Sequence, residues 1–225
     1  MPLLILFAAI AAFVAGHFLL SHPLRDAAVR TFGEQGFRFA YSAIAVVLLP
    51  LAFIAFRRAP HVPVLWDHGH PLIGLAFDVV TYISVVLFTG SLFGNPARYN
   101  RNRELMLEQP PRGTVLMTRH PMMFAFALWS IAEIVLVPAA RQAILFGGIA
   151  IFAIAGAALQ DRKLLVLFGK DWRLWMERTP FWPDPRRITA PGLNWLFALI
   201  PWLILTWLHT HLGQEPVGIW LLETK

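Results

Sequence analysis

Hydrophobic residues in this chain form long blocks, and polar residues collect in the stretches between the blocks. An α-helix needs about 17 to 25 mostly apolar residues to cross a hydrocarbon core of about 30 Å. The blocks reach this length and lack the short alternation of half-buried strands. They predict six spanning helices, over residues 2–21, 37–56, 71–94, 121–137, 143–159 and 193–208. We therefore expect an all-α polytopic membrane helix bundle, a single integral membrane domain over residues 1–225.

Composition agrees with lipid as the solvent of this chain. Of its 225 residues, 57% are hydrophobic and only 14% are charged, against about 25% charged in soluble domains. Pro71, Pro121 and Pro138 stand at the edges of predicted spans, where a missing N–H is tolerated. The net charge of +6 is better explained by basic loops facing anionic lipid than by nucleic acid. We expect the lipid bilayer as partner and no nucleic acid.

The distribution of Lys and Arg predicts the orientation in a bacterial inner membrane. The loops after the first, third and fifth spans hold 15 of the 19 basic residues, and the other side holds Arg57, Arg58, Arg141 and Lys225. Cytoplasmic loops carry the excess of Lys and Arg, so both termini should face outward. No basic residue precedes the first block, so we expect a retained span and not a cleaved signal peptide. The Trp-rich stretch 171–185 should lie at the membrane interface.

The chain contains no cysteine, which excludes disulfides, thiolate nucleophiles, iron–sulfur ligation and Cys-type zinc sites. Ionisable groups inside a bilayer are costly and are therefore candidate functional residues. One group of polar residues falls at the predicted cytoplasmic end of the spans: His17, His22, Tyr41, Arg119, His120 and Asp161. His17 and His22 point about 140° apart on one helix, so either would have to pair with His120. We expect His22 and His120 to share a cavity and to be the metal candidates, whereas His17 alone is read as a polar residue at a wet interface.

A second group lies deeper, toward the predicted outer side. Asp78 stands about 10 Å into the third span at 1.5 Å per residue, and Glu133 lies five residues before Pro138. Two carboxylates at one depth would raise each other's pKa or share a proton or cation. We expect Glu133 to face the bundle interior. The remaining histidines are interpreted as solvated: His61, His68 and His70 in the loop that holds Asp67, and His209 and His211 at the surface.

Several short motifs, in order, resemble the NnrU family, over most of the chain up to about residue 185. The marks are Ser21-His22, the run from Gly33-Glu34 to Tyr41-Ser42, Leu65-Trp66, and Arg119-His120-Pro121. NnrU proteins are associated with nitrite and nitric-oxide reduction in denitrifying bacteria, and they are similar to zeta-carotene isomerases, which carry haem b and isomerise a polyene double bond. The resemblance therefore implies a hydrophobic small molecule as a further partner, and His22 as an axial haem ligand.

One position departs from that family pattern. The family's second histidine follows as Trp-x-x-Ala-His, and this chain has Trp129-Ser130-Ile131-Ala132-Glu133. Glutamate is a poor match for a bis-histidine haem. The resemblance thus implies a haem that is absent, altered or held by His120, with His17, Arg119, Tyr41 and Glu133 as further cofactor-binding candidates.

Two other functions stay open. The Arg119-His120-Pro121 motif and the later Phe168-Gly169-Lys170-Asp171-Trp172 segment resemble S-adenosylmethionine-binding membrane methyltransferases of the isoprenylcysteine carboxyl type. That superfamily has paired acidic residues where this chain has Gln160-Asp161. A third possibility is a non-catalytic transporter or assembly factor that uses Asp78 and Glu133 as a proton or cation site.

Overall fold

The computed structural model describes residues 1–21, 23–60, 71–98, 102–212 and 220. These residues form seven α-helices and two short 3-10 helices, with no β-strand in the described ranges. The α-helices are α1 (Pro2–Ser21), α2 (Arg25–Arg58), α3 (Pro71–Gly90), α4 (Arg103–Glu108), α5 (Pro121–Leu136), α6 (Ala140–Arg178) and α7 (Asn194–His211). The 3-10 helices are η1 (Gly113–Leu116) and η2 (Pro185–Arg187).

Each of the six predicted spans falls on one of these helices. By length and composition, α1, α2, α3 and α6 are apolar enough to cross a membrane, and α5 is a shorter apolar helix. The sixth predicted span corresponds to α7, which has 18 residues. The all-α membrane helix bundle is confirmed.

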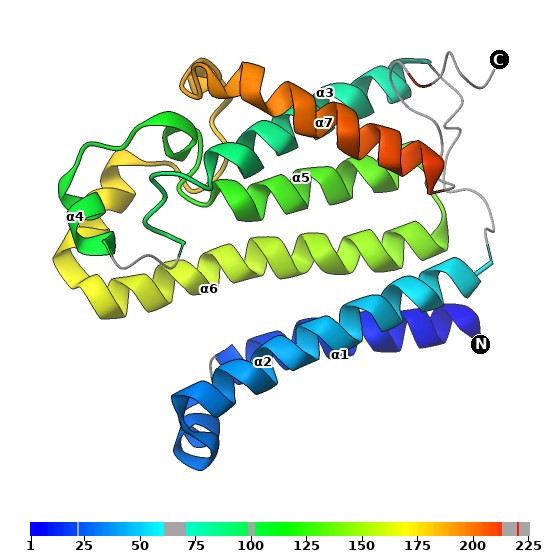
Figure 1. Cartoon of the computed structure of the whole chain (residues 1–225), viewed down its shortest axis with the longest axis horizontal. Helices are drawn as coiled ribbons and strands as arrows, with labels where there is room; N and C mark the ends of the chain where they lie inside the picture. Colours follow the sequence, from blue (N-terminus) through cyan, green and yellow to red (C-terminus); the bar gives the residue numbers. More distant parts are fainter. Residues whose placement is uncertain (22, 61–70, 99–101, 213–219, 221–225) are drawn as a thin grey trace.

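The helices lie roughly along one direction (Figure 1). The chain runs up α1 and back along α2, and this hairpin packs against α6, mainly through α1. On the other side of α6 stands α5, followed by α3 and then by α7, which packs along α3. We call the two ends of the bundle the Met1 end and the Ser21 end, after the two ends of α1. The Met1 end also holds the last residues of α2, α5 and α7.

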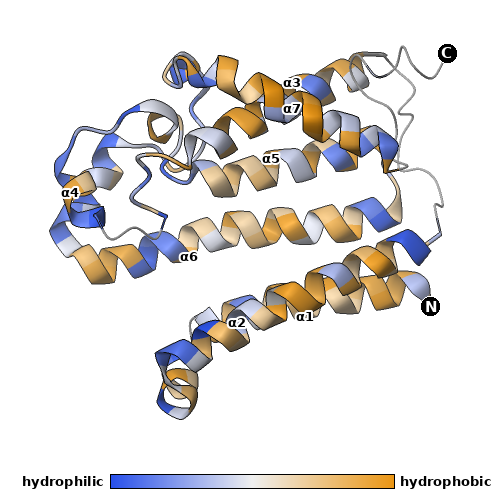
Figure 2. Cartoon of the chain, viewed as in Figure 1, coloured by the Kyte–Doolittle hydropathy of each residue, from blue (hydrophilic) through white to orange (hydrophobic). Residues whose placement is uncertain are grey.

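Apolar residues remain exposed along the outside of the bundle. Val46 of α2 is 71% exposed and Ile151 of α6 is 62% exposed, a degree of apolar exposure that soluble monomers rarely present over contiguous areas. Figure 2 shows hydrophobic colours along the helices and hydrophilic ones near their ends and around α4. This surface fits a lipid bilayer as the immediate surroundings.

Small residues allow two close approaches between elements. A Cβ atom added at Gly148 of α6 would overlap the Ile10 side chain of α1, and one added at Gly90 would overlap the Thr114 side chain. Near the first approach, Leu6, Ile10, Ala52, Phe56 and Leu145 form a buried apolar cluster that joins α1, α2 and α6. Gly148 therefore sets how closely the α1–α2 hairpin sits on α6.

Two helices extend well beyond the predicted spans. α2 begins at Arg25 and passes a kink at Gly33 (φ 70°), and α6 continues to Arg178 past a kink at Gly169 (φ 48°). The positive φ at each kink suits glycine, which has no Cβ to clash. Within the stretch predicted to lie at the interface, Trp172 and Trp175 are buried and pack with Leu107 and Leu164, whereas Trp182 is 61% exposed.

Candidate functional site

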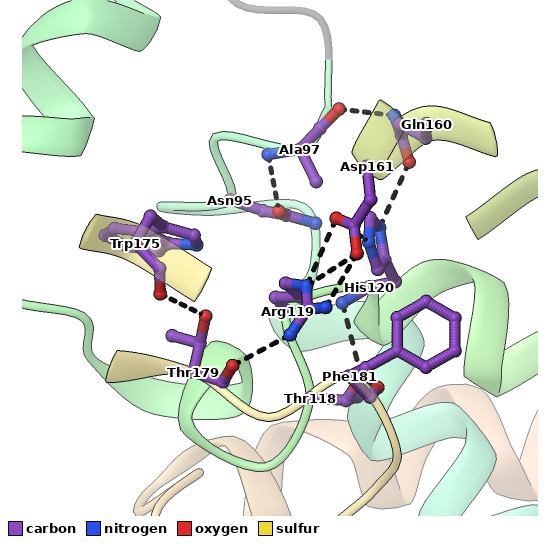
Figure 3. Close-up of polar contacts among 10 residues, drawn as sticks. All are labelled: Asn95, Ala97, Thr118, Arg119, His120, Gln160, Asp161, Trp175, Thr179 and Phe181. Carbon is purple, nitrogen blue, oxygen red and sulfur yellow. Dashed lines mark hydrogen bonds and ion pairs between the residues drawn. The ribbon is translucent and has the colours of Figure 1, made fainter. Parts of the chain in front are cut away.

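Polar side chains gather inside the bundle at both ends, and Figure 3 shows the group at the Ser21 end. Arg119 lies just before Pro121, the first residue of α5. Its guanidinium donates to both carboxylate oxygens of Asp161 on α6, at 2.7 to 3.1 Å, and to the carbonyl of Thr179 at 2.9 Å. Both side chains are nearly buried, at 9% and 11% exposed. A forked donor set on a carboxylate is the geometry that makes a buried ion pair tolerable.

His120 belongs to the same group and is fully enclosed. Its Nε2 lies 2.7 Å from Asp161 Oδ1, and its Nδ1 lies 3.2 Å from Gln160 Oε1. Gln160 in turn donates its amide to the Ala97 carbonyl at 2.5 Å. Since both ring nitrogens already contact oxygens, neither is free to bind a metal in this arrangement.

An aromatic loop covers this group. The Phe181 ring lies 5.1 Å from the Arg119 guanidinium carbon and 5.6 Å from the His120 ring. Thr118 Oγ1 donates to the Phe181 carbonyl at 2.5 Å, and the Arg119 backbone N–H donates to the Pro180 carbonyl at 2.8 Å. The group thus holds the segment after α6 against the start of α5 through hydrogen bonds, so its role is to stabilise the fold.

His17 and Tyr41 meet elsewhere. His17 is buried, at 4% exposed, and not at a wet interface as expected. Its Nδ1 lies 2.8 Å from the Phe13 carbonyl, and its ring packs against Tyr41 of α2 and Phe152 of α6. Tyr41 accepts a hydrogen bond from Ser21 at 3.3 Å. No described contact joins this group to His120. His22, His61, Leu65, Trp66, Asp67, His68 and His70 lie outside the described residues.

The group at the Met1 end is centred on Glu133, which is 2% exposed and faces the bundle interior as predicted. Trp129 Nε1 donates to its Oε1 at 2.9 Å, and His209 Nε2 lies 3.1 Å from Oε1 and 3.2 Å from Oε2. No described contact joins Glu133 to Asp78, and Asp78 Oδ1 is buried without a hydrogen-bond partner among the described residues. Asp78 was expected to share a proton or a cation with Glu133, but the partner of Glu133 in the structure is His209.

The surface position predicted for His209 is therefore wrong, because this residue is only 8% exposed. The spacing of polar and aromatic residues along α7 could have predicted that His209 is buried. Trp202, Thr206 and His209 recur at intervals of four and three residues, the spacing of one helical face. Trp202 Nε1 donates to Thr81 of α3, which places that face against the bundle.

The described residues do not fit the haem that the family resemblance implied. His120 has both ring nitrogens occupied, and Glu133 is taken up by Trp129 and His209. Among the described residues, no three His, Asp or Glu side chains gather as a metal-binding group.

An apolar cavity of about 320 Å³ lies between α3, α5 and α7. Its lining is Ser84, Val85, Phe88, Ala125, Phe126, Trp129 and Leu205. The Ser84 hydroxyl donates to the Val80 carbonyl of its own helix at 2.8 Å, so the lining offers a ligand almost no polar contact. Trp129 connects the cavity with the polar group around Glu133. Its ring lines the cavity, and its N–H donates a hydrogen bond to Glu133.

Fold and cavity together define a polytopic α-helical membrane protein with an apolar cavity between α3, α5 and α7, partly open to the outside of the bundle at Phe126 and Leu205. The family model for the NnrU protein matches residues 5–216. The chain belongs to the NnrU family, and the match continues through α7, beyond the limit near residue 185 that the motifs suggested. No solved structure matches the chain significantly.

One curated relative supplies a more specific likeness. The chain is 24% identical over 195 residues to the chloroplastic 15-cis-zeta-carotene isomerase of Arabidopsis thaliana. The alignment covers 81% of this chain and 52% of the relative. The chain thus spans about half the length of the curated relative it matches.

Proposed function

We propose that this NnrU-family protein takes an elongated, apolar polyene from the lipid into the cavity between α3, α5 and α7 and isomerises one of its double bonds. The observation that carries the proposal is the cavity itself, with its almost wholly apolar lining inside a membrane bundle. The likeness to an enzyme named for 15-cis-zeta-carotene supports the choice of a polyene.

The lining suits that class of molecule for a physical reason. A hydrocarbon chain gains no hydrogen bonds, so it is held by shape and by contact with apolar and aromatic groups. Phe88, Phe126 and Trp129 offer aromatic rings to a conjugated chain. A cis–trans isomerisation leaves the atoms and the oxidation state of the polyene unchanged, so the reaction consumes no co-substrate, and the site holds the chain on both sides of the double bond that changes geometry.

A conversion assay tests this function. Purified protein in liposomes is incubated with 15-cis-zeta-carotene, and the isomers are separated by liquid chromatography. We expect the wild-type protein to isomerise the polyene faster than protein-free liposomes do. Leu205→Trp fills the cavity and should lower the rate to that of protein-free liposomes. Ile131→Trp is the control, because Ile131 is 45% exposed and outside the cavity lining. Equal rates for wild type, Leu205→Trp and protein-free liposomes would contradict the proposal.

Two alternative functions that depend on a cofactor, haem or S-adenosylmethionine, find less support in the described residues. Haem b with a role in nitrogen-oxide respiration rests on the family resemblance, and S-adenosylmethionine-dependent methyl transfer rests on the Arg119-His120-Pro121 motif. Both would use His120, whose ring nitrogens already contact Asp161 and Gln160. An absorption spectrum of the purified protein with metal analysis tests the first, and equilibrium dialysis with labelled S-adenosylmethionine tests the second.

A further inference from the structure

Glu133 and His209 lie directly beyond one end of the apolar cavity. On α5, Glu133 follows the cavity residue Trp129 by four positions, and on α7, His209 follows the cavity residue Leu205 by four. Four residues advance a helix by about 6 Å, and both helices run toward the Met1 end (Figure 1). The two side chains therefore occupy the layer next to the cavity.

The third helix around the cavity, α3, adds an aromatic wall to this layer. The Phe77 ring lies 5.5 Å from the His209 ring and 6.3 Å from the Trp129 ring. Phe77 is itself 2% exposed. The Glu133–His209 pair is thus enclosed by apolar and aromatic groups, and the cavity lies on the side of the pair where Trp129 stands.

The hydrogen bonds of the pair leave one atom unmatched. A carboxylate only accepts hydrogen bonds, so Glu133 receives the N–H of Trp129 and that of His209 Nε2. His209 Nδ1 is buried and has no hydrogen-bond partner among the described residues. Buried polar atoms without a partner are uncommon and costly. In a neutral imidazole that bears its proton on Nε2, this Nδ1 is an acceptor.

We propose that the Glu133–His209 pair is a binding site for the hydroxyl group of an apolar molecule whose body fills the cavity. The hydroxyl donates to His209 Nδ1, and Glu133 holds the imidazole in the tautomer that accepts. Trp129 keeps the Glu133 carboxylate in place from the cavity side. This inference rests on the proposed function and narrows it, because it makes the site prefer a polyene alcohol to the hydrocarbon of the same chain.

Binding of two matched probes tests the preference. All-trans-retinol is a polyene alcohol, and all-trans-axerophthene is the same polyene without the oxygen. Each is titrated into the full-length protein in lipid nanodiscs, and quenching of tryptophan fluorescence gives the dissociation constant. We expect wild type to bind the alcohol about tenfold more tightly than the hydrocarbon, the size of one net hydrogen bond to a buried acceptor.

His209→Phe removes the acceptor and keeps a ring in the layer, so both probes should bind with equal affinity. His211→Phe is the matched control, since His211 lies on the same helix and is exposed; it should keep the preference. Retained binding of the hydrocarbon shows that His209→Phe is folded. If it is not, the double variant Glu133→Leu with His209→Leu, which removes both polar partners together, replaces it.

The outcomes separate the two proposals. Equal affinity of wild type for both probes, or a preference that survives in His209→Phe, overturns the hydroxyl site and leaves the apolar pocket standing. Failure of wild type to bind either probe overturns both the hydroxyl site and the proposed function.

Discussion

At the scale of single residues, the polar groups inside this bundle divide by whether their hydrogen bonds are complete. Arg119, Asp161 and His120 satisfy one another and the adjacent backbone. His209 leaves a buried nitrogen without a described partner. A saturated group stabilises the fold, and an incomplete one is where a ligand can add a contact. We therefore regard the Arg119–Asp161–His120 group as structural and place the proposed ligand contact at His209.

Removing the charge of Asp161 should destabilise the protein strongly. Asp161→Asn leaves the Arg119 guanidinium buried without its counter-charge, which typically costs about 3–5 kcal/mol. We expect a clearly lowered melting temperature in detergent. Arg162→Ala changes the exposed next residue and should melt like wild type. Equal melting temperatures for wild type and Asp161→Asn would show that the pair is not an anchor.

The amino-acid sequence showed part of this residue-scale picture. It placed Arg119, His120 and Asp161 at one level because each stands at the end of an apolar block, and the structure brings them into contact. It missed His209, which stands near the polar end of its helix and was taken for a surface residue. Partner choice inside a bundle depends on how α5 and α7 are rotated, which hydropathy does not report.

At the scale of elements, the apolar blocks located the six long helices α1, α2, α3, α5, α6 and α7, because lipid demands a continuous hydrogen-bonded helix of fixed minimum length. The extensions of α2 and α6 were not predicted. Both carry charged residues, and such residues in a helix outside lipid look like a loop when judged by hydropathy. Trp172 and Trp175 were expected at the membrane interface for their residue type, and the sequence did not show that both pack inside the fold.

Packing between α1 and α6 depends on one of two adjacent glycines. A Cβ at Gly148 would overlap the Ile10 side chain, whereas one at Gly147 would meet nothing within 4 Å. Gly148→Ala should lower the melting temperature, at a cost of about 1–3 kcal/mol for overpacking, and Gly147→Ala should not. Adding Ile10→Ala to Gly148→Ala should recover part of the loss. Equal effects of the two glycine substitutions would contradict this packing.

At the scale of the whole molecule, the orientation in the membrane follows from the basic residues and is directly testable. The chain has no cysteine, so single cysteines report without background. Arg58→Cys and Arg141→Cys, at the Met1 end, should react with an impermeant thiol reagent added outside intact cells. Arg103→Cys and Lys170→Cys should react only after the cells are opened. The reverse pattern would contradict the predicted orientation.

The position of the cavity in the bundle bears on how a ligand reaches it. The cavity lies among α3, α5 and α7, and Phe126 in its lining is 46% exposed on the outside of the bundle. An apolar molecule dissolved in the bilayer can therefore meet the cavity without passing through water.

Locating a polyene in the cavity is the most direct test of this account. A photoactivatable diazirine analogue of phenylalanine replaces Phe126 in the lining or, as the control, the lipid-facing Ile131 on the same helix. After illumination with 15-cis-zeta-carotene in nanodiscs, mass spectrometry counts polyene adducts on each variant. We predict adducts at position 126 in clear excess over position 131, and their loss when Leu205→Trp is added. Equal adduct yields at the two positions would contradict a polyene site between α3, α5 and α7.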